Sequence, residues 1–139
     1  MRICCDTTFL IDLSRGRRKA ETAYNELLAR KVKLHTTFLN VGEILAGAFL
    51  LPAVKRNESA KEVWNMVGGF SILGVDRSRM KVICEEYAAL NYHLSSRGMD
   101  IPTSDKVIIA ISLAHDIRAF LTRDVNHYMR VSGIDVIGY

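Results

Sequence analysis

The sequence predicts an α/β fold in which a central parallel sheet carries helices on both faces. Short apolar runs that are typical of buried strands recur along the chain, and each is followed by a longer segment whose apolar residues have helical spacing. Such an alternation is typical of parallel sheets. With 139 residues, of which 49% are hydrophobic, the chain is long enough for one compact domain with its own core, and we expect a single domain over residues 1–139.

The first half of the chain is expected to hold two strands and four helices. Three consecutive apolar residues mark the first strand, and helical spacing followed by a Gly or Pro stop marks the helices. The elements are a strand over Arg2–Asp6, a helix over Thr7–Leu13 capped by Thr7 or Thr8, a helix with Ala20, Tyr24, Leu27 and Leu28 on one face, a strand over Val32–His35, a helix over Phe38–Leu51 and a helix over Ser59–Val67.

The second half continues the same alternation. Its elements are a strand over Phe70–Val75, a helix from Asp76 as its cap to Ser96 with Val82, Ile83, Tyr87 and Leu90 facing inward, a helix over Ser104–His115, a strand over Ala119–Leu121, a helix over Val125–Val131 and a strand over Ile134–Ile137. Open sheets of this class bind ligands at the carboxyl ends of their strands. Residues that directly follow a strand are therefore candidates for a functional site.

Composition excludes several classes of protein. The three cysteines, Cys4, Cys5 and Cys84, have no spacing typical of disulfides or zinc ligands, so we expect buried thiols. No apolar run approaches the roughly 18 residues that span a bilayer, and the first run is too short for a signal peptide, which predicts a cytoplasmic protein. A net charge of +4 permits a polyanionic partner without requiring one.

Four carboxylates have unusual surroundings. Asp6 and Asp124 follow expected strands, and Asp105 lies at the start of a helix; each of the three is also explained by helix capping or by favourable charge in a first helical turn. Glu43 differs, because it is the only charged residue from Thr36 to Val54. Burying it without a partner is costly, so a cation is favoured over the alternative of a Glu that reaches solvent.

Together the four carboxylates predict a metal site. At about 5 Å and an effective dielectric near 20, each pair of them would repel by roughly 3 kcal/mol. A divalent cation removes this repulsion, and ligands made only of oxygen favour Mg²⁺ or Mn²⁺ over zinc. We therefore expect one acidic pocket that binds the metal through the following residues: Asp6, Glu43, Asp105 and Asp124.

Four segments carry a resemblance to the PIN-domain ribonucleases, especially the VapC-type toxins of prokaryotic toxin–antitoxin pairs. These segments, in an order and spacing that cover nearly the whole chain, are Ile3–Asp12, Asn40–Leu45, Ile101–Ala110 and Leu121–Tyr128. The resemblance implies a three-layer α/β/α domain and a metal-dependent endoribonuclease that hydrolyses RNA by metal-activated water. It implies that the four carboxylates are the metal-binding and catalytic residues, and that Thr7, Asn40 and Thr122 support them or position water.

The resemblance also implies partners: transfer or ribosomal RNA as substrate, an inhibiting VapB-like antitoxin, and a second copy in a homodimer. Basic residues near the expected mouth of the site would contact RNA phosphates, although an ordinary solvated helix start explains most of them equally well. These residues are Arg15, Arg17, Arg18 and Arg123. Lys106 departs from the family, which more often has an uncharged residue after the Asp; it either reaches the pocket or points to solvent.

An apolar stretch over residues 48–52, with Val54 and Trp64, has more bulk than one helix face needs. Core packing is favoured for most of it, and contact with a second subunit or an antitoxin helix is the alternative.

In the expected mechanism, Asp6 and Asp105 hold one metal ion directly, and Glu43 and Asp124 act through water or hold a second ion. In-line attack then leaves a 5′-phosphate and a 3′-hydroxyl, without a role for histidine. The alternatives are a PIN nuclease that processes RNA but is not a toxin, a non-catalytic PIN scaffold that binds RNA or protein, and a haloacid-dehalogenase-like phosphatase with Asp6 as nucleophile. The last needs a second Asp at position 8, where this chain has Thr8.

Overall fold

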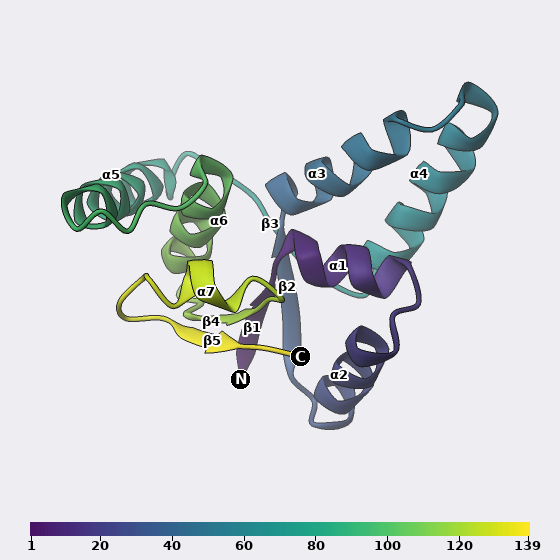
Figure 1. Cartoon of the computed structure of the whole chain (residues 1–139), viewed down its shortest axis with the longest axis horizontal. Helices are drawn as coiled ribbons and strands as arrows, with labels where there is room; N and C mark the ends of the chain where they lie inside the picture. The colour runs from purple at the N-terminus through teal and green to yellow at the C-terminus, as the bar shows by residue number, and fades with distance from the viewer.

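The computed structural model describes residues 1–139 and contains one five-stranded sheet (Figure 1). The strands are β1 (Arg2–Cys5), β2 (Lys33–Thr37), β3 (Ser71–Leu73), β4 (Ala119–Leu121) and β5 (Asp135–Ile137). Their order across the sheet is β3-β2-β1-β4-β5, and every neighbouring pair is parallel. The expected parallel sheet is confirmed, with the first strand of the chain at its centre.

Helices connect the strands as expected, with some differences at their ends. They are α1 (Thr7–Ser14), α2 (Arg18–Ala29), α3 (Phe38–Phe49), α4 (Ala53–Val67), α5 (Met80–Ser96), α6 (Thr103–Ala114) and α7 (Val125–Tyr128). α4 begins directly after Pro52, earlier than predicted, because proline is compatible with a helix start. None of the helices combines the length and the apolar character that crossing a membrane demands.

Successive side chains of β1 point alternately into two hydrophobic cores, one on each face of the sheet. Ile3 and Cys5 face a core that includes side chains of α1, α2, α3 and α4, whereas Cys4 faces a core with side chains of α5 and α6. This is the two-residue period of a strand that is buried on both faces. The sheet is therefore the middle of three layers, as predicted (Figure 1).

The inner faces of two helices differ from the prediction. Leu28 in α2 and Val82 in α5 are 45% and 43% exposed. In α5 the buried residues are Ile83, Leu90 and Leu94, and Val82 precedes the first of them by one position, which turns it by about 100° around the helix. Cys84, on the same helix, is exposed, so the expectation of buried thiols holds only for the two cysteines of β1.

The helix pair α3–α4 extends away from the sheet (Figure 1). The turn between these helices exposes large apolar side chains, namely Phe49 at 63%, Leu50 at 88% and Val54 at 92%, and we call these three side chains the apolar tip. Trp64, near the other end of α4, is 53% exposed. Core packing was the favoured expectation for this stretch, and for these four side chains it is wrong.

Candidate metal-binding site

The four carboxylates come from four different elements that meet at one edge of the sheet. Asp6 follows β1, Asp124 follows β4, Glu43 lies in α3 and Asp105 lies in α6. The backbone N–H of Asp6 donates to the carbonyl of Leu121 at 3.1 Å, which joins the ends of the two central strands. The charge of Asp124 contributes to the raised pKa of both Asp6 and Asp105, and the charge of Glu43 also acts on Asp105.

Asp6 is buried at the end of the central strand, with 4% of its surface exposed. Oδ1 accepts hydrogen bonds from the Phe9 N–H at 3.0 Å and the Thr8 hydroxyl at 2.8 Å, and Oδ2 accepts one from the Thr122 hydroxyl at 2.6 Å. Asp6 thus caps α1, and the expectation that Thr7 or Thr8 does so is wrong. Burial raises the pKa of Asp6 to about 6, against the opposing effect of these donors.

Glu43 is half-buried and accepts a short hydrogen bond from the hydroxyl of Thr7. The Thr7 oxygen in turn accepts from the side-chain amide of Asn40 at 2.9 Å. Asn40 is fully buried, and its Oδ1 accepts from the N–H and the hydroxyl of Thr37 at 3.0 and 2.6 Å, which completes a capping box at the start of α3. The chain therefore supplies Glu43 with a hydroxyl partner and holds that hydroxyl in place.

Asp105 lies in the first turn of α6, where the expected stabilisation by the helix N-terminus also applies. Burial is the main cause of its raised pKa, with Glu43 and Asp124 adding to it and His127 opposing it. Nδ1 of His127 lies 3.4 Å from Oδ2 of Asp105, an ion-pair distance when the imidazole is protonated. No role for a histidine was expected from the sequence, and the contact was not recognisable there because His127 lies in α7 and its partner lies in another helix.

Asp124 is exposed and precedes α7, but its side chain makes no capping hydrogen bond. The alternative reading of Asp124 as a helix cap is therefore wrong. Its N–H donates to the Thr122 hydroxyl oxygen at 2.9 Å, and the same hydroxyl donates to Asp6. Thr122, itself fully buried, thus links the two aspartates that follow the central strands.

The side chains fit a hard divalent cation by their chemistry. The donors are carboxylate oxygens, which Mg²⁺ and Mn²⁺ prefer, while the thiols of Cys4 and Cys5 are buried in the two cores. The Tyr128 hydroxyl is buried without a hydrogen-bond partner, and after burial the charges of Asp6 and Asp105 contribute to its raised pKa. An unsatisfied polar atom beside carboxylates is suited to bound water or to a hydrated ion.

The carboxylates are not gathered into a tight cage. No three side chains of His, Cys, Asp or Glu lie close enough together to bind one metal ion. Thr122 links Asp6 to Asp124, whereas Glu43 is bonded to Thr7 and Asp105 lies beside His127. A Mg²⁺ ion commonly keeps several waters and takes one or two carboxylates from a protein, so this arrangement suits an ion held partly through water.

The basic residues fall into two groups. Arg15, Arg17 and Arg18 are exposed at the turn between α1 and α2. Arg15 also lines a groove of about 710 Å³ between α1, α3 and α4, which reaches Glu43. Arg123 differs, because its guanidinium Nη1 lies 2.9 Å from both carboxylate oxygens of Asp12.

Lys106 neither reaches the acidic pocket nor points to solvent, the two positions expected from the sequence. It is 3% exposed, and its Nζ lies 2.6 Å from Oδ1 of Asp100 and 2.8 Å from Oδ1 of Asn91. It therefore points away from both the carboxylates and bulk solvent, and it joins α6 to α5 and to the segment between them. Burial of a lysine is tolerated here because both partners accept from its ammonium group.

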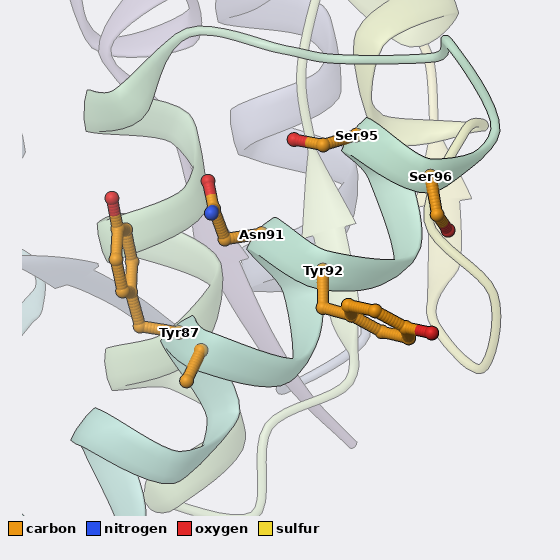
Figure 2. Close-up of a pocket in the computed structure, with 6 residues that line it drawn as sticks. Tyr87, Asn91, Tyr92, Ser95 and Ser96 are labelled. Atoms are coloured by element: carbon orange, nitrogen blue, oxygen red, sulfur yellow. The ribbon is translucent and has the colours of Figure 1, made fainter.

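A separate hollow of about 630 Å³ lies along α5 (Figure 2). Tyr87, Asn91 and Ser95 lie along one side of the helix in this view, whereas Tyr92 and Ser96 lie on another. None of the four carboxylates lines this hollow. The groove that reaches Glu43 is therefore the one that adjoins the candidate site.

Comparisons with known proteins agree with this geometry. A family model described as PIN domain matches residues 3–132. No curated protein matches the chain significantly. Among solved structures, VapBC2 from Rickettsia felis bound to a promoter DNA fragment is similar with a TM-score of 0.85 and 14% identity, covering 100% of this chain and 99% of that chain.

Two further structures have the same fold. VapBC-1 from nontypeable Haemophilus influenzae has a TM-score of 0.82 and 20% identity, over 99% of this chain and 98% of that chain. VapBC-5 from Mycobacterium tuberculosis, a member of the VapBC family of toxin–antitoxin systems, has a TM-score of 0.69 and 18% identity, over 99% of this chain and 96% of that chain.

Proposed function

The chain belongs to the PIN domain family, and on this premise we propose that residues 1–139 form a metal-dependent endoribonuclease that acts as the toxin of a VapBC-type module. The observation that carries the proposal is the buried carboxylate of Asp6 at the end of the central strand, linked through Thr122 to Asp124. Glu43 and Asp105 complete an acidic centre of oxygen ligands. RNA is the proposed substrate, as the resemblance to PIN-domain ribonucleases implies.

Each residue has a role in this proposal. Asp6, Glu43, Asp105 and Asp124 would hold Mg²⁺ or Mn²⁺, directly or through water. When bound, the ion would supply a coordinated water of lowered pKa and positive charge beside the phosphate. Asp124, the exposed carboxylate, would accept a proton from the attacking water. The water oxygen would bond to phosphorus as the bond to O3′ breaks, and O3′ would take a proton from solvent, which leaves a 5′-phosphate and a 3′-hydroxyl. Thr122 holds Asp6, and Asn40 holds Thr7 against Glu43.

The direct test is cleavage of a labelled mixture of transfer and ribosomal RNA. We expect cleavage with Mn²⁺, none with EDTA, and at least about a 100-fold loss in Asp105→Asn, because changes even in the groups around metal ligands cost 10–100-fold. Asp116→Asn, which changes an exposed Asp beyond the other end of α6, is the matched control and should cleave normally.

Three results would count against the proposal. Undiminished cleavage in EDTA would refute a metal mechanism, and full activity of Asp105→Asn would refute this placement of the site. No cleavage by the wild type with any divalent metal would favour the non-catalytic scaffold.

The exposed arginines at the α1–α2 turn are proposed to bind RNA phosphates. The triple variant Arg15→Gln, Arg17→Gln, Arg18→Gln should bind RNA more weakly in EDTA, and the dependence of log Kd on log salt should become shallower by up to about 2, at roughly 0.7 per lost single-strand contact. Filter binding at several salt concentrations measures both. A matched triple variant of exposed basic residues on or beside α5 (Arg77→Gln, Lys81→Gln, Arg97→Gln) keeps the net charge equal, and an equal loss in it would mean that binding follows total charge alone.

An antitoxin and a second copy are the proposed protein partners. The structural neighbours include a toxin–antitoxin complex, and the groove of about 710 Å³ beside Glu43 offers an antitoxin segment a path to the acidic centre. The apolar tip is left uncovered in the single chain, and large apolar side chains that are exposed close together are typical of protein interfaces. We therefore assign the groove to the antitoxin and the apolar tip to contact with another subunit.

A further inference from the structure

We propose that Asp12, Arg123 and Tyr139 form a clamp that positions Asp124 relative to Asp6. These three residues, the Asp12 clamp, join α1 to the loop after β4 and to the segment after β5. The inference rests on the proposed function, because the clamp serves the site that holds the metal. It makes Arg123 a positioning residue.

Asp12 is the centre of the clamp. Its side chain is 7% exposed, and it is not one of the four carboxylates of the site. Both of its oxygens lie 2.9 Å from Nη1 of Arg123, and Oδ2 also accepts from the Tyr139 hydroxyl at 2.9 Å. A buried carboxylate needs a cation and hydrogen-bond donors, and here the three contacts supply both.

The clamp acts on a short loop that is already attached to Asp6. Thr122 donates to Asp6 through its hydroxyl, and the N–H of Arg123 donates to the Thr8 hydroxyl oxygen at 3.1 Å. The next residue is Asp124. Since Arg123 lies between Thr122 and Asp124, the bond from its side chain to Asp12 restrains the rotation of the backbone that carries Asp124.

Tyr139 supports the clamp from the other side. Its ring packs edge-to-face on Phe9, with centroids 5.1 Å apart. Phe9 is also the residue whose N–H is held by Oδ1 of Asp6. The clamp and the cap of α1 therefore belong to one packed unit. Asp6 is attached to α1 as its cap, and Asp124 is attached to the same helix through Arg123 and Asp12.

The contact with Asp12 favours one of two roles for Arg123. Its side chain is 57% exposed, and a role in RNA binding was expected from the sequence. If the guanidinium turned to an RNA phosphate, the Asp12 carboxylate would stay buried without a cation, which is strongly unfavourable. The charge of Arg123 is thus committed to Asp12, and the effect of Arg123 on RNA is exerted through Asp124.

The test uses the full chain carrying Asp12→Asn, Arg123→Met or Tyr139→Phe. Without RNA, Asp12→Asn and Arg123→Met should each bind Mn²⁺ about 10-fold more weakly by calorimetry, the loss expected when a group that orients a ligand is removed. RNA affinity in EDTA should change less than about 2-fold. Amide hydrogen exchange of Asp124 should become faster in all three variants. Tyr139→Phe keeps the ring on Phe9, so it tests the clamp with little risk to folding.

Asp76→Asn is the matched control, because it weakens an exposed Asp–Arg pair with a distance of 2.5 Å in the segment before α5. It should leave Mn²⁺ binding and the Asp124 amide unchanged. Normal Mn²⁺ binding in Asp12→Asn, or a loss of RNA affinity in Arg123→Met that Asp12→Asn does not share, would overturn the clamp. If the wild type binds no Mn²⁺, the proposed function fails, and the exchange of the Asp124 amide still decides: an unchanged rate in Asp12→Asn and Tyr139→Phe refutes the clamp.

Discussion

Asp6→Asn is expected to abolish RNA cleavage and, without metal, to make the protein more stable. Activity should fall at least about 100-fold, because mutation even of residues that only surround the ligands of a metal ion lowers metal affinity or activity by 10–100-fold. Stability should rise because burial raises the pKa of Asp6 from 3.8 to about 6, so the folded protein favours the neutral form. At pH 7 the wild type keeps a buried charge that costs roughly 3 kcal/mol, at 1.36 kcal/mol for each pH unit.

The pH dependence of protein stability tests whether the charge of Asp6 destabilises the fold. For a carboxyl whose pKa is raised on folding, the stabilisation is complete below 3.8 and is lost as the pH rises through about 6. Thermal melting in EDTA should therefore show the wild type losing stability over this range, while Asp6→Asn does so less. Asparagine can keep the Phe9 and Thr8 contacts through its oxygen and donate to Thr122, so the cap of α1 survives.

Addition of Mn²⁺ should reverse the order of the two proteins. A ligand that binds only the folded state adds about 4.1 kcal/mol at a concentration of 1,000 Kd, which the wild type gains and the variant does not, and this gain exceeds the roughly 3 kcal/mol cost of the buried charge. Asp116→Asn serves as the control and should behave like the wild type in both conditions. If Asp6→Asn melts at a lower temperature in EDTA, the capping role of Asp6 outweighs the cost of its charge, and the predicted sign is wrong.

Thr122→Val is expected to move the acid limb of RNA cleavage to higher pH. The variant removes the hydroxyl that donates to the buried Asp6 and accepts from the N–H of Asp124, at nearly constant volume. A hydrogen bond to a charged group contributes about 1.5–3 kcal/mol, so its loss should raise the pKa of Asp6 by roughly 1 to 2 units. Because the ionised carboxylate is the form that binds a cation, and the wild-type Asp6 is about half ionised at pH 6, activity at that pH should fall about 5- to 50-fold and recover toward pH 8.5.

Thr122→Ser keeps the hydroxyl and should retain the pH profile of the wild type. Initial cleavage rates at one fixed, subsaturating Mn²⁺ concentration between pH 5.5 and 9 distinguish the two variants. A loss in Thr122→Val that is equal at every pH would show that Thr122 only supports the local structure and does not control the protonation of Asp6.

Most of the fold was predictable, because strand and helix periods are local properties of the chain. β4 has the predicted range Ala119–Leu121, and the other strands differ only at their ends. The start of α5 was wrong because the Asp76 side chain accepts from the Arg79 N–H at 3.0 Å and caps a separate turn there. A cap is recognisable from sequence, but whether a turn or a helix follows it depends on the packing of the next residues.

The partners of the site residues were less predictable than their positions. Glu43 was expected to need a cation, but the Thr7 hydroxyl from another helix already bonds to it. Lys106 was expected to reach the pocket or solvent, and it is buried against Asp100. Asp12 lay within a segment used for the family resemblance and yet had no assigned role, because its partner Arg123 is 111 residues away. Such pairings follow from tertiary structure and leave no periodic signal in the chain.

The position of β1 at the centre of the sheet has a consequence for synthesis on the ribosome. Its partner on one side is β2, which follows soon, but the other is β4, and Ile3 pairs with Ala119. The Asp6–Thr122 contact spans 116 residues. Asp6 is therefore synthesised long before the loop that completes its site. On the proposed function, a nascent chain has no cleavage centre until the loop after β4 has been synthesised. A late-closing parallel pair, intrinsically slow to form, thereby acts as a delay between translation and toxicity.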